Sequence, residues 1–313
     1  QAAGDVNLWA GTSVRTRYRH QVERIAPTVL VGREAELAEL ADFCTDPATA
    51  GSYRWWRAGP WAGKSALMAT FVLSPPAGVR VVSFFVTARL AGQSDRGAFV
   101  DNVLEQLLAL LGEQLPSFLT PATREAHLLG LLNDAAQACT QRGESLTLIV
   151  DGLDEDRGVT TGPDAHSIAG LLPSRLPPNM RVVLAGRPDP PVPGDVHPDH
   201  PLLDSKIVRV LQPSPQARLL RRQMEDELLS LLDGADTGRD LLGLLTAAGG
   251  GLTAEDLANL SGQQLWRVER QLQTVTGRSF SRRNSHLTPE SVPEVYLLGH
   301  EQLQITALDM FGE

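Results

Sequence analysis

The sequence predicts an α/β fold in which helices cover both faces of a parallel sheet, followed by a separate helical part. Two observations lead to this prediction. Short apolar runs typical of fully buried strands alternate with helical patterns as far as residue 213. After Pro213-Ser214-Pro215 the pattern becomes all-helical. The length of 313 residues is also that of roughly two domains.

The composition excludes several classes of protein. Hydrophobic residues make up 42% of the chain and charged residues 21%, which excludes a collagen or a disordered tail. No apolar run reaches the ~18 residues that a membrane-spanning helix needs. Because the formal net charge is −9, we do not expect nucleic acid to be the main partner.

The cysteines and the chain ends give two further expectations. Cys44 and Cys139 have no CxxC spacing, so they indicate neither a disulfide framework nor a zinc site. No apolar leader opens the sequence, and we expect a cytoplasmic protein. Since the chain begins at Gln1 and ends at Glu313, we expect it to be a piece of a longer polypeptide.

The N-terminal part leads into the first strand. Residues 1–28 have a basic cluster and weak helical periodicity, and we interpret them as an arm or linker. Apolar residues three apart predict a helix within Val31–Cys44. The strand Tyr53–Arg57 then enters a glycine-rich turn, and the helix Ser65–Leu73 that follows stops before Pro75-Pro76.

Strands and helices continue to alternate beyond that point. The predicted strands are Val79–Leu90, Leu146–Asp151, Met180–Gly186 and Ile207–Leu211, and the predicted helices are Phe99–Leu111, Thr123–Gln141 and Ser167–Leu172. An open parallel sheet binds its ligand at the carboxyl ends of its strands. We therefore look for the site in the residues that directly follow each strand.

The C-terminal part is predicted to be a helix-turn-helix with a hairpin, which is a winged helix. Its helices are Gln216–Leu232, Gly238–Ala248, Thr253–Leu260 and Gln263–Thr276, and its hairpin comprises Arg278–Arg283 and Val295–Leu298. We accordingly divide the chain into an arm (1–28), an α/β core (29–213), a helical segment (214–248) and a winged-helix domain (249–313).

The turn after the first strand matches a phosphate-binding loop. Its sequence AGPWAGKS fits the P-loop pattern G-x-x-x-x-G-K-[ST] with Ala58 at the first position. In such a turn, backbone N–H groups bind phosphate, the lysine reaches the β and γ oxygens, and the serine hydroxyl ligates Mg²⁺. Lys64 and Lys206 are the only lysines among 28 basic residues, so a lysine at this position is informative. The residues expected to bind nucleotide here are Gly59, Pro60, Trp61, Ala62, Gly63, Lys64, Ser65 and Ala66.

A run of carboxylates follows the apolar strand that ends at Asp151. In a P-loop enzyme, a carboxylate directly after the strand holds Mg²⁺, and a later one polarises the attacking water. We predict that Asp151 and Ser65 bind Mg²⁺ and that Asp154 or Glu155 is catalytic, with Asp154 as the first candidate. The alternative is a solvated acidic turn.

Arg187 directly follows another buried strand, Met180–Gly186. A cation at this place can face the γ-phosphate and stabilise its charge. The alternative is an arginine that caps a helix or pairs with a surface carboxylate.

The segments VGREAEL, GPWAGKS, LIVDGLDE and VVLAGRP occur in this order, and together they resemble the STAND class of P-loop NTPases, most closely its NACHT group. Gly152, which separates Asp151 from the later acids, is the NACHT-like feature. The resemblance covers about residues 28–313 and implies an NTPase core followed by a helical segment and a winged helix. Ala58, Trp61 and Gly186 depart from the family pattern.

The resemblance also implies two roles outside the P-loop. It places Val31, Gly32 and Arg33 against the adenine, and it lets His300 on the winged helix contact the β-phosphate of ADP in a closed form. A helix cap is the alternative role for His300.

The function that the resemblance implies is a nucleotide-operated switch. ATP or ADP binds with Mg²⁺, hydrolysis is slow and regulatory, and the nucleotide state controls opening and self-association. Such modules lie between effector and sensor domains in larger proteins of signalling or antiviral defence.

Two other functions remain open. The first is a DNA-binding ATPase, which would use basic residues of the winged helix, although Glu255, Asp256 and Glu269 lie nearby. Those basic residues are Arg267, Arg270, Arg278, Arg282 and Arg283. The second is a metabolic or nucleotide kinase, for which the sequence offers no evident substrate lid.

Overall fold

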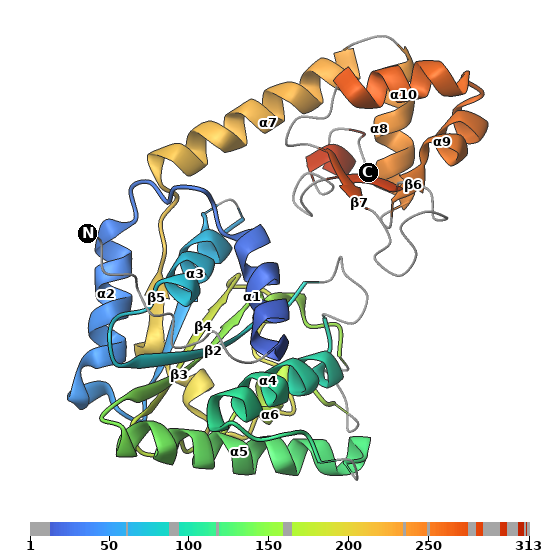
Figure 1. Cartoon of the computed structure of the whole chain (residues 1–313). Coiled ribbons are helices and arrows are strands. Elements are labelled where there is room, and N and C mark those ends of the chain that lie inside the picture. Colours follow the sequence, from blue (N-terminus) through green and yellow to red (C-terminus); the bar gives the residue numbers. More distant parts are fainter. Residues whose placement is uncertain are drawn as a thin grey trace, which may run out of the picture. The chain divides into compact units, whose positions relative to one another are not determined.

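The computed structural model describes residues 13–60, 62–87, 94–116, 119–158, 165–233, 236–248, 251–274, 280–283, 295–298, 306–309 and 311. The chain divides into two compact units, Gln1–Pro215 and Gln216–Glu313, and each is considered by itself (Figure 1). Among the described residues, no helix has both the length and the apolar character needed to cross a membrane.

The first unit is built on a five-stranded sheet in the order β2-β3-β4-β1-β5, and all four neighbouring pairs are parallel. The strands are β1 (Tyr53–Arg57), β2 (Val79–Phe85), β3 (Ser145–Asp151), β4 (Met180–Gly186) and β5 (Val208–Val210). This arrangement confirms the predicted α/β fold. Because β4 lies between β1 and β3, the residues that follow these three strands meet at one edge of the sheet.

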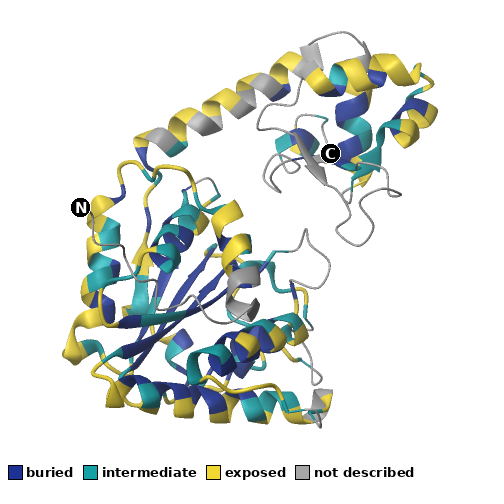
Figure 2. Cartoon of the chain, in the orientation of Figure 1, coloured by how far each residue is buried: buried dark blue, intermediate teal, exposed yellow. Residues whose placement is uncertain are grey.

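Helices cover both faces of this sheet (Figure 1). One face is covered by α2 (Glu34–Thr45) and α3 (Lys64–Leu73), and the other by α4 (Arg96–Leu111), α5 (Pro121–Gln141) and α6 (Ile168–Leu171). Every residue of β3 and β4 is therefore buried, which explains why both strands are rich in apolar residues (Figure 2). Short 3₁₀ turns lie at η1 (Pro47–Thr49), η2 (Leu153–Glu155), η3 (Pro201–Leu203) and η4 (Ser205–Ile207).

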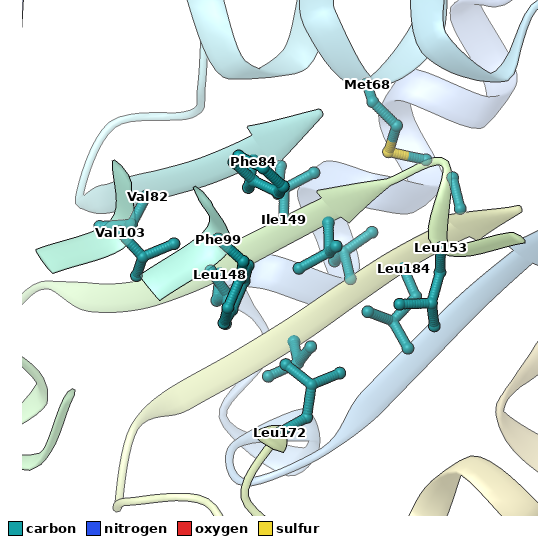
Figure 3. Close-up of a cluster of buried hydrophobic side chains, with 14 of the residues drawn as sticks. Met68, Val82, Phe84, Phe99, Val103, Leu148, Ile149, Leu153, Leu172 and Leu184 are labelled. Carbon is teal, nitrogen blue, oxygen red and sulfur yellow. The ribbon is translucent and has the colours of Figure 1, made fainter. Parts of the chain in front are cut away.

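The core of this unit lies between the sheet and its helices. Phe84 of β2 meets Phe99 of α4 edge to face, with ring centroids 5.6 Å apart (Figure 3). Met68 of α3 and Leu148 of β3 belong to the same buried cluster (Figure 3). The side chains of this cluster thus join α3 and α4 to the central strands.

The segment that we interpreted as an arm contains a helix, α1 (Ser13–Ile25). Tyr18 and Val22 on this helix are buried, and the Tyr18 ring stacks on Phe84 at a centroid distance of 6.5 Å. The Tyr18 hydroxyl accepts a hydrogen bond of 2.8 Å from the backbone N–H of Phe85. These contacts make α1 part of the core of the first unit. The strand predicted over Val79–Leu90 ends earlier, at Phe85, and residues 88–93 lie outside the described residues.

The second unit combines helices with a small antiparallel sheet in the order β6-β8-β7. Its elements are α7 (Pro215–Asp233), α8 (Asp236–Ala248), β6 (Leu252–Thr253), α9 (Ala254–Ser261), α10 (Leu265–Thr274), β7 (Phe280–Arg283) and β8 (Val295–Leu298). Thr253 and Asp256 form a capping box at the start of α9, as their spacing predicts. A helix-turn-helix beside an antiparallel hairpin is the predicted winged-helix arrangement.

The apolar sides of α8, α9 and α10 face one another, and α8 and α9 also contact the small sheet. Its buried side chains include Leu241, Leu242, Leu245, Leu257, Val268, Leu272, Tyr296 and Leu298. This unit therefore has a hydrophobic core of its own.

Gly152 supplies a test of how closely the first unit is packed. Its φ is +76°, and a Cβ there would lie 2.5 Å from the carbonyl oxygen of Val86. Gly112 has almost the same φ, +77°, with open space around the Cβ position. We expect Gly112→Ala to lower the free energy of unfolding by about 1–2 kcal/mol, and Gly152→Ala by about 1–3 kcal/mol more. Urea denaturation measures both values, and equal losses would show that the close contact costs nothing.

Candidate functional site

The predicted P-loop joins the end of β1 to the start of α3. Gly63, the last residue before α3, has a φ of +84°, in the left-handed region that glycine adopts without strain. Among the described residues, Asn179 is the only non-glycine residue with a positive φ, so Ala58 does not lie in that region. Alanine is therefore compatible with the backbone at the first position of the loop.

Lys64 lies against the loop that precedes it. Its Nζ donates to the carbonyl oxygens of Ala58 at 2.9 Å and Gly59 at 3.1 Å. Burial lowers the pKa of Lys64, and the nearby carboxylates of Asp151 and Asp154 oppose this shift. The ammonium group is thus placed between the carbonyls of the loop and the acidic residues after β3.

Asp151 ends β3 and is only 3% exposed. Burial raises the pKa of its carboxyl to about 7, while a hydrogen bond from Ser65 and the charge of Lys64 lower it. Its Oδ1 atom is buried and has no hydrogen-bond partner among the described residues. A buried carboxylate oxygen that lacks a partner, next to a serine hydroxyl, fits a hard cation such as Mg²⁺.

No group of three or more His, Cys, Asp or Glu side chains forms a metal centre within the described part of the chain. This finding is compatible with Mg²⁺, which takes one or two carboxylates from a protein and fills its other positions with water and phosphate. Asp151 and Ser65 therefore remain the candidate ligands.

Arg187 and Asp154 are brought together by β4 and the turn η2. The backbone N–H of Arg187 donates to Oδ1 of Asp154 at 2.9 Å, and its Nε donates to Oδ2 at 2.5 Å. The Asp154 side chain is 4% exposed, so this pair is largely shielded from water. Arg187 lies at the predicted place, but both Asp154 oxygens are already engaged, and the carboxylate is not open to an attacking water here. Glu155, the other candidate, is half-buried, and its charge is among those that oppose the lowering of the Lys64 pKa by burial.

Gly186 makes the pairing of Asp154 with Arg187 sterically feasible. A Cβ at this position would lie 3.0 Å from Oδ1 of Asp154 and 3.6 Å from Nε1 of Trp55. A serine or threonine, which the STAND proteins that the sequence resembles have at this position, would crowd the carboxylate. The departure at Gly186 is therefore linked to the way Asp154 is held.

The segment expected to contact adenine divides into an exposed and a buried part. Val31 is 55% exposed, and Gly32 is also exposed. Arg33 is 4% exposed, and its guanidinium pairs with Glu36 and donates to the carbonyl of Ala62. The Arg33 side chain therefore binds protein groups, and adenine contact by these three residues stays a prediction.

Two predicted residues, Trp61 and His300, lie outside the described residues. The remaining positions of the P-loop lie between β1 and the first turn of α3, with Pro60 half-buried, Ala62 buried and Ala66 half-buried. Their roles in nucleotide binding also stay predictions.

Arg57 at the end of β1 was not expected to belong to the site. Its guanidinium carbon lies 3.8 Å from the centroid of the Trp55 ring, and its Nε is buried without a hydrogen-bond partner among the described residues. Burial lowers the pKa of Arg57, opposed by the charge of Asp189. Arg57 thus places a cation at the end of β1, directly before the P-loop. An arginine at the end of a strand of aromatic residues, directly before the P-loop, is the signal that could have identified it.

Comparison with known proteins gives only remote similarities. No protein-family model matches the chain, and no curated protein matches it by sequence. The Walker-type ATPase of Pyrococcus abyssi is similar over 91% of this chain and 97% of its own, with 13% identity and a TM-score of 0.39. The ORC2 protein of Aeropyrum pernix is similar over 92% of this chain and 95% of its own, with 11% identity and a TM-score of 0.37. A winged helix-turn-helix DNA-binding domain from Mycobacterium bovis is similar over 32% of this chain and 84% of its own, with 20% identity and a TM-score of 0.25. None of these similarities assigns a ligand to the chain.

The raised pKa of Asp151 makes stability depend on pH in the absence of Mg²⁺ and nucleotide. Because this pKa is about 7 in the folded chain and its ordinary value is 3.8, the folded state retains a proton between these pH values that the unfolded state has lost. This contribution to stability is present at low pH and is lost as the pH rises through about 7. We expect Asp151→Asn to reduce the loss of unfolding free energy between pH 5 and pH 8 by about 1–3 kcal/mol. Urea denaturation at both pH values checks this, and identical losses for parent and variant would contradict it.

Proposed function

We propose that this chain binds ATP and ADP with Mg²⁺ at the edge where β1, β4 and β3 end, and that it hydrolyses ATP slowly. The observation that supports this proposal most is the buried carboxylate of Asp151, which has an oxygen without a partner and lies beside Ser65 and Lys64. Binding of phosphate together with Mg²⁺ requires a cation, a hydroxyl and a carboxylate close to one another. Lys64, Ser65 and Asp151 provide these three groups.

Each group of the loop then has a distinct role. Backbone N–H groups at the start of α3, with the partial positive charge of the helix, attract phosphate oxygens. The Lys64 ammonium exchanges the carbonyls of Ala58 and Gly59 for oxygens of the β- and γ-phosphates. Ser65 and Asp151 would hold Mg²⁺, which would supply positive charge to neutralise these phosphates.

The ion pair between Asp154 and Arg187 would make hydrolysis depend on the presence of a γ-phosphate. The guanidinium of Arg187 is attracted by the γ-phosphate and leaves the Asp154 carboxylate. Asp154 can then orient a water for attack on the γ-phosphorus, which yields ADP and inorganic phosphate. In the described conformation Asp154 is occupied, which is consistent with slow, regulated turnover.

On this basis we propose a nucleotide-dependent switch of the STAND class, in which bound ADP favours a closed form and ATP favours opening and self-association. The sequence resemblance supports this role, as does the direct connection of the first unit to a winged-helix unit. Contact between His300 and the β-phosphate remains a prediction, and so do the flanking effector and sensor domains and the place in signalling or antiviral defence.

Binding of DNA by the winged helix is a second candidate function. Trp266 on α10 is 54% exposed, and Arg267 and Arg270 on the same helix are also exposed. Exposed Glu255 and Glu269 lie on α9 and α10, and their charge opposes phosphate binding. This alternative requires duplex binding that weakens steeply as salt is raised.

The two lysines of the chain provide a matched test of nucleotide binding. We expect Lys64→Ala to weaken the binding of ADP and ATP about 100-fold, because it removes the cation nearest to the phosphates. Lys206→Ala removes the other lysine, which is exposed next to β5, and should leave the affinity unchanged. Titration calorimetry with Mg²⁺ present measures both affinities. Equal affinities for Lys64→Ala and the parent would refute the assignment of the P-loop.

The two candidate catalytic carboxylates can be separated by substituting each with its amide. We expect Asp154→Asn to retain ADP affinity and to lower single-turnover hydrolysis about 100-fold, because the amide cannot polarise water. Glu155→Gln serves as the comparison, and a larger effect there would transfer the role to Glu155. Unchanged hydrolysis in both variants would mean that this acidic turn takes no part in the reaction.

A further inference from the structure

The side chain of Arg33 joins two segments that lie far apart in the sequence. Arg33 directly precedes α2 and is 4% exposed. Its Nη2 donates to the carbonyl oxygens of Ala62 and Gln212, both at 2.6 Å. Its Nη1 pairs with Glu36. A single nitrogen of the guanidinium therefore holds one carbonyl of the P-loop and one carbonyl after β5.

The contact with Ala62 fixes the orientation of a peptide group in the P-loop. The carbonyl of Ala62 and the N–H of Gly63 belong to one planar trans peptide, so they point in opposite directions. Because Arg33 holds the carbonyl, the N–H of Gly63 must point away from Arg33. Gly63 also has the left-handed φ of +84° that begins α3. The guanidinium thus sets the direction of an N–H group that can bind phosphate.

The contact with Gln212 fixes the connector, which we define as residues 211–214 between β5 and α7. The N–H of Leu211 donates to the carbonyl of Arg57 at 2.9 Å, directly before the P-loop. Pro213 has no N–H, so the peptide between Gln212 and Pro213 offers only its carbonyl for hydrogen bonding. Arg33 binds that carbonyl. The connector is therefore held at its start by β1 and one residue later by Arg33.

We propose that Arg33 is a positioning residue that couples the phosphate-binding loop to the connector, so that a nucleotide in the loop restrains the chain entering the second unit. If either carbonyl moves away, a buried charged donor loses a partner, and this costs free energy. The two segments are therefore more stable when both are in the observed positions. This inference rests on the proposed binding of ADP.

Hydrogen exchange of the full chain with and without Mg²⁺ and ADP tests this coupling. In the parent, ADP should slow amide exchange in residues 57–66 and also in the connector. Arg33→Ala and the milder Arg33→Lys should raise the Kd for ADP about tenfold, which corresponds to the loss of a hydrogen bond to a charged group. At saturating ADP, both variants should still protect the P-loop but no longer protect the connector.

Arg181→Ala is the matched control. Arg181 is 1% exposed, and its Nη2 also donates to a backbone carbonyl, that of Asp46, at 2.5 Å. It lies near the amino end of β4, away from the P-loop. This variant should keep the protection of the connector by ADP even though it loses a similarly buried arginine.

The outcomes separate this inference from the proposed function. If the parent does not bind ADP, the proposed function fails and the coupling fails with it. If ADP protects only the P-loop of the parent, nucleotide binding stands and the coupling is wrong. If ADP still protects the connector in Arg33→Lys, which circular dichroism can show to be folded, Arg33 does not transmit the effect. Loss of protection in Arg181→Ala as well would reduce the effect to general destabilisation.

Discussion

The structure depends on one constraint, which is the burial of several charged groups at the edge where β1, β4 and β3 end. Asp151 is the last residue of β3, Arg187 directly follows β4, and Lys64 follows the loop after β1. Because the site is shielded from water, each unpaired charge there costs free energy. Lys64 is compensated by carbonyls of the loop, and Arg187 by Asp154. Asp151 is the exception, because one of its oxygens has no partner among the described residues. Mg²⁺ bound together with nucleotide phosphates would give this oxygen a partner. This is the physical reason for proposing nucleotide binding.

Close approach of backbone segments makes this arrangement of charges possible. Gly152 lets the turn after Asp151 run against the carbonyl of Val86, and Gly186 leaves room for the carboxylate of Asp154. In both places a side chain would displace the groups that hold the acidic turn. Both Gly152, the NACHT-like feature of the sequence, and Gly186, which departs from that family's pattern, therefore have a steric explanation in this chain. The same lack of a side chain at Gly186 leaves room for the pairing of Asp154 with Arg187.

Much of the fold could be predicted because the central strands of this sheet, β3 and β4, are buried on both faces. Predominantly apolar or aromatic runs with a clear end located β1 and β4 to the residue and β3 to within one residue. The same signal overshot in β2, where the sequence stays apolar past Phe85 although the strand ends there. The helix α1 was interpreted as an arm because its sequence is basic and weakly periodic, and its buried residues Tyr18 and Val22 are separated by exposed basic ones. The contacts of Arg33 could not be predicted, because its partners Ala62 and Gln212 contribute backbone carbonyls that every residue possesses.

The central claim is that the edge formed by β1, β4 and β3 holds the phosphates of an adenine nucleotide. The most direct test is to denature the purified chain and identify the released small molecules by chromatography and mass spectrometry. The account predicts that ADP or ATP is released in an amount comparable to the protein, or is retained after incubation with Mg²⁺ and nucleotide followed by gel filtration. Release of no nucleotide, together with no retention after such incubation, would contradict it.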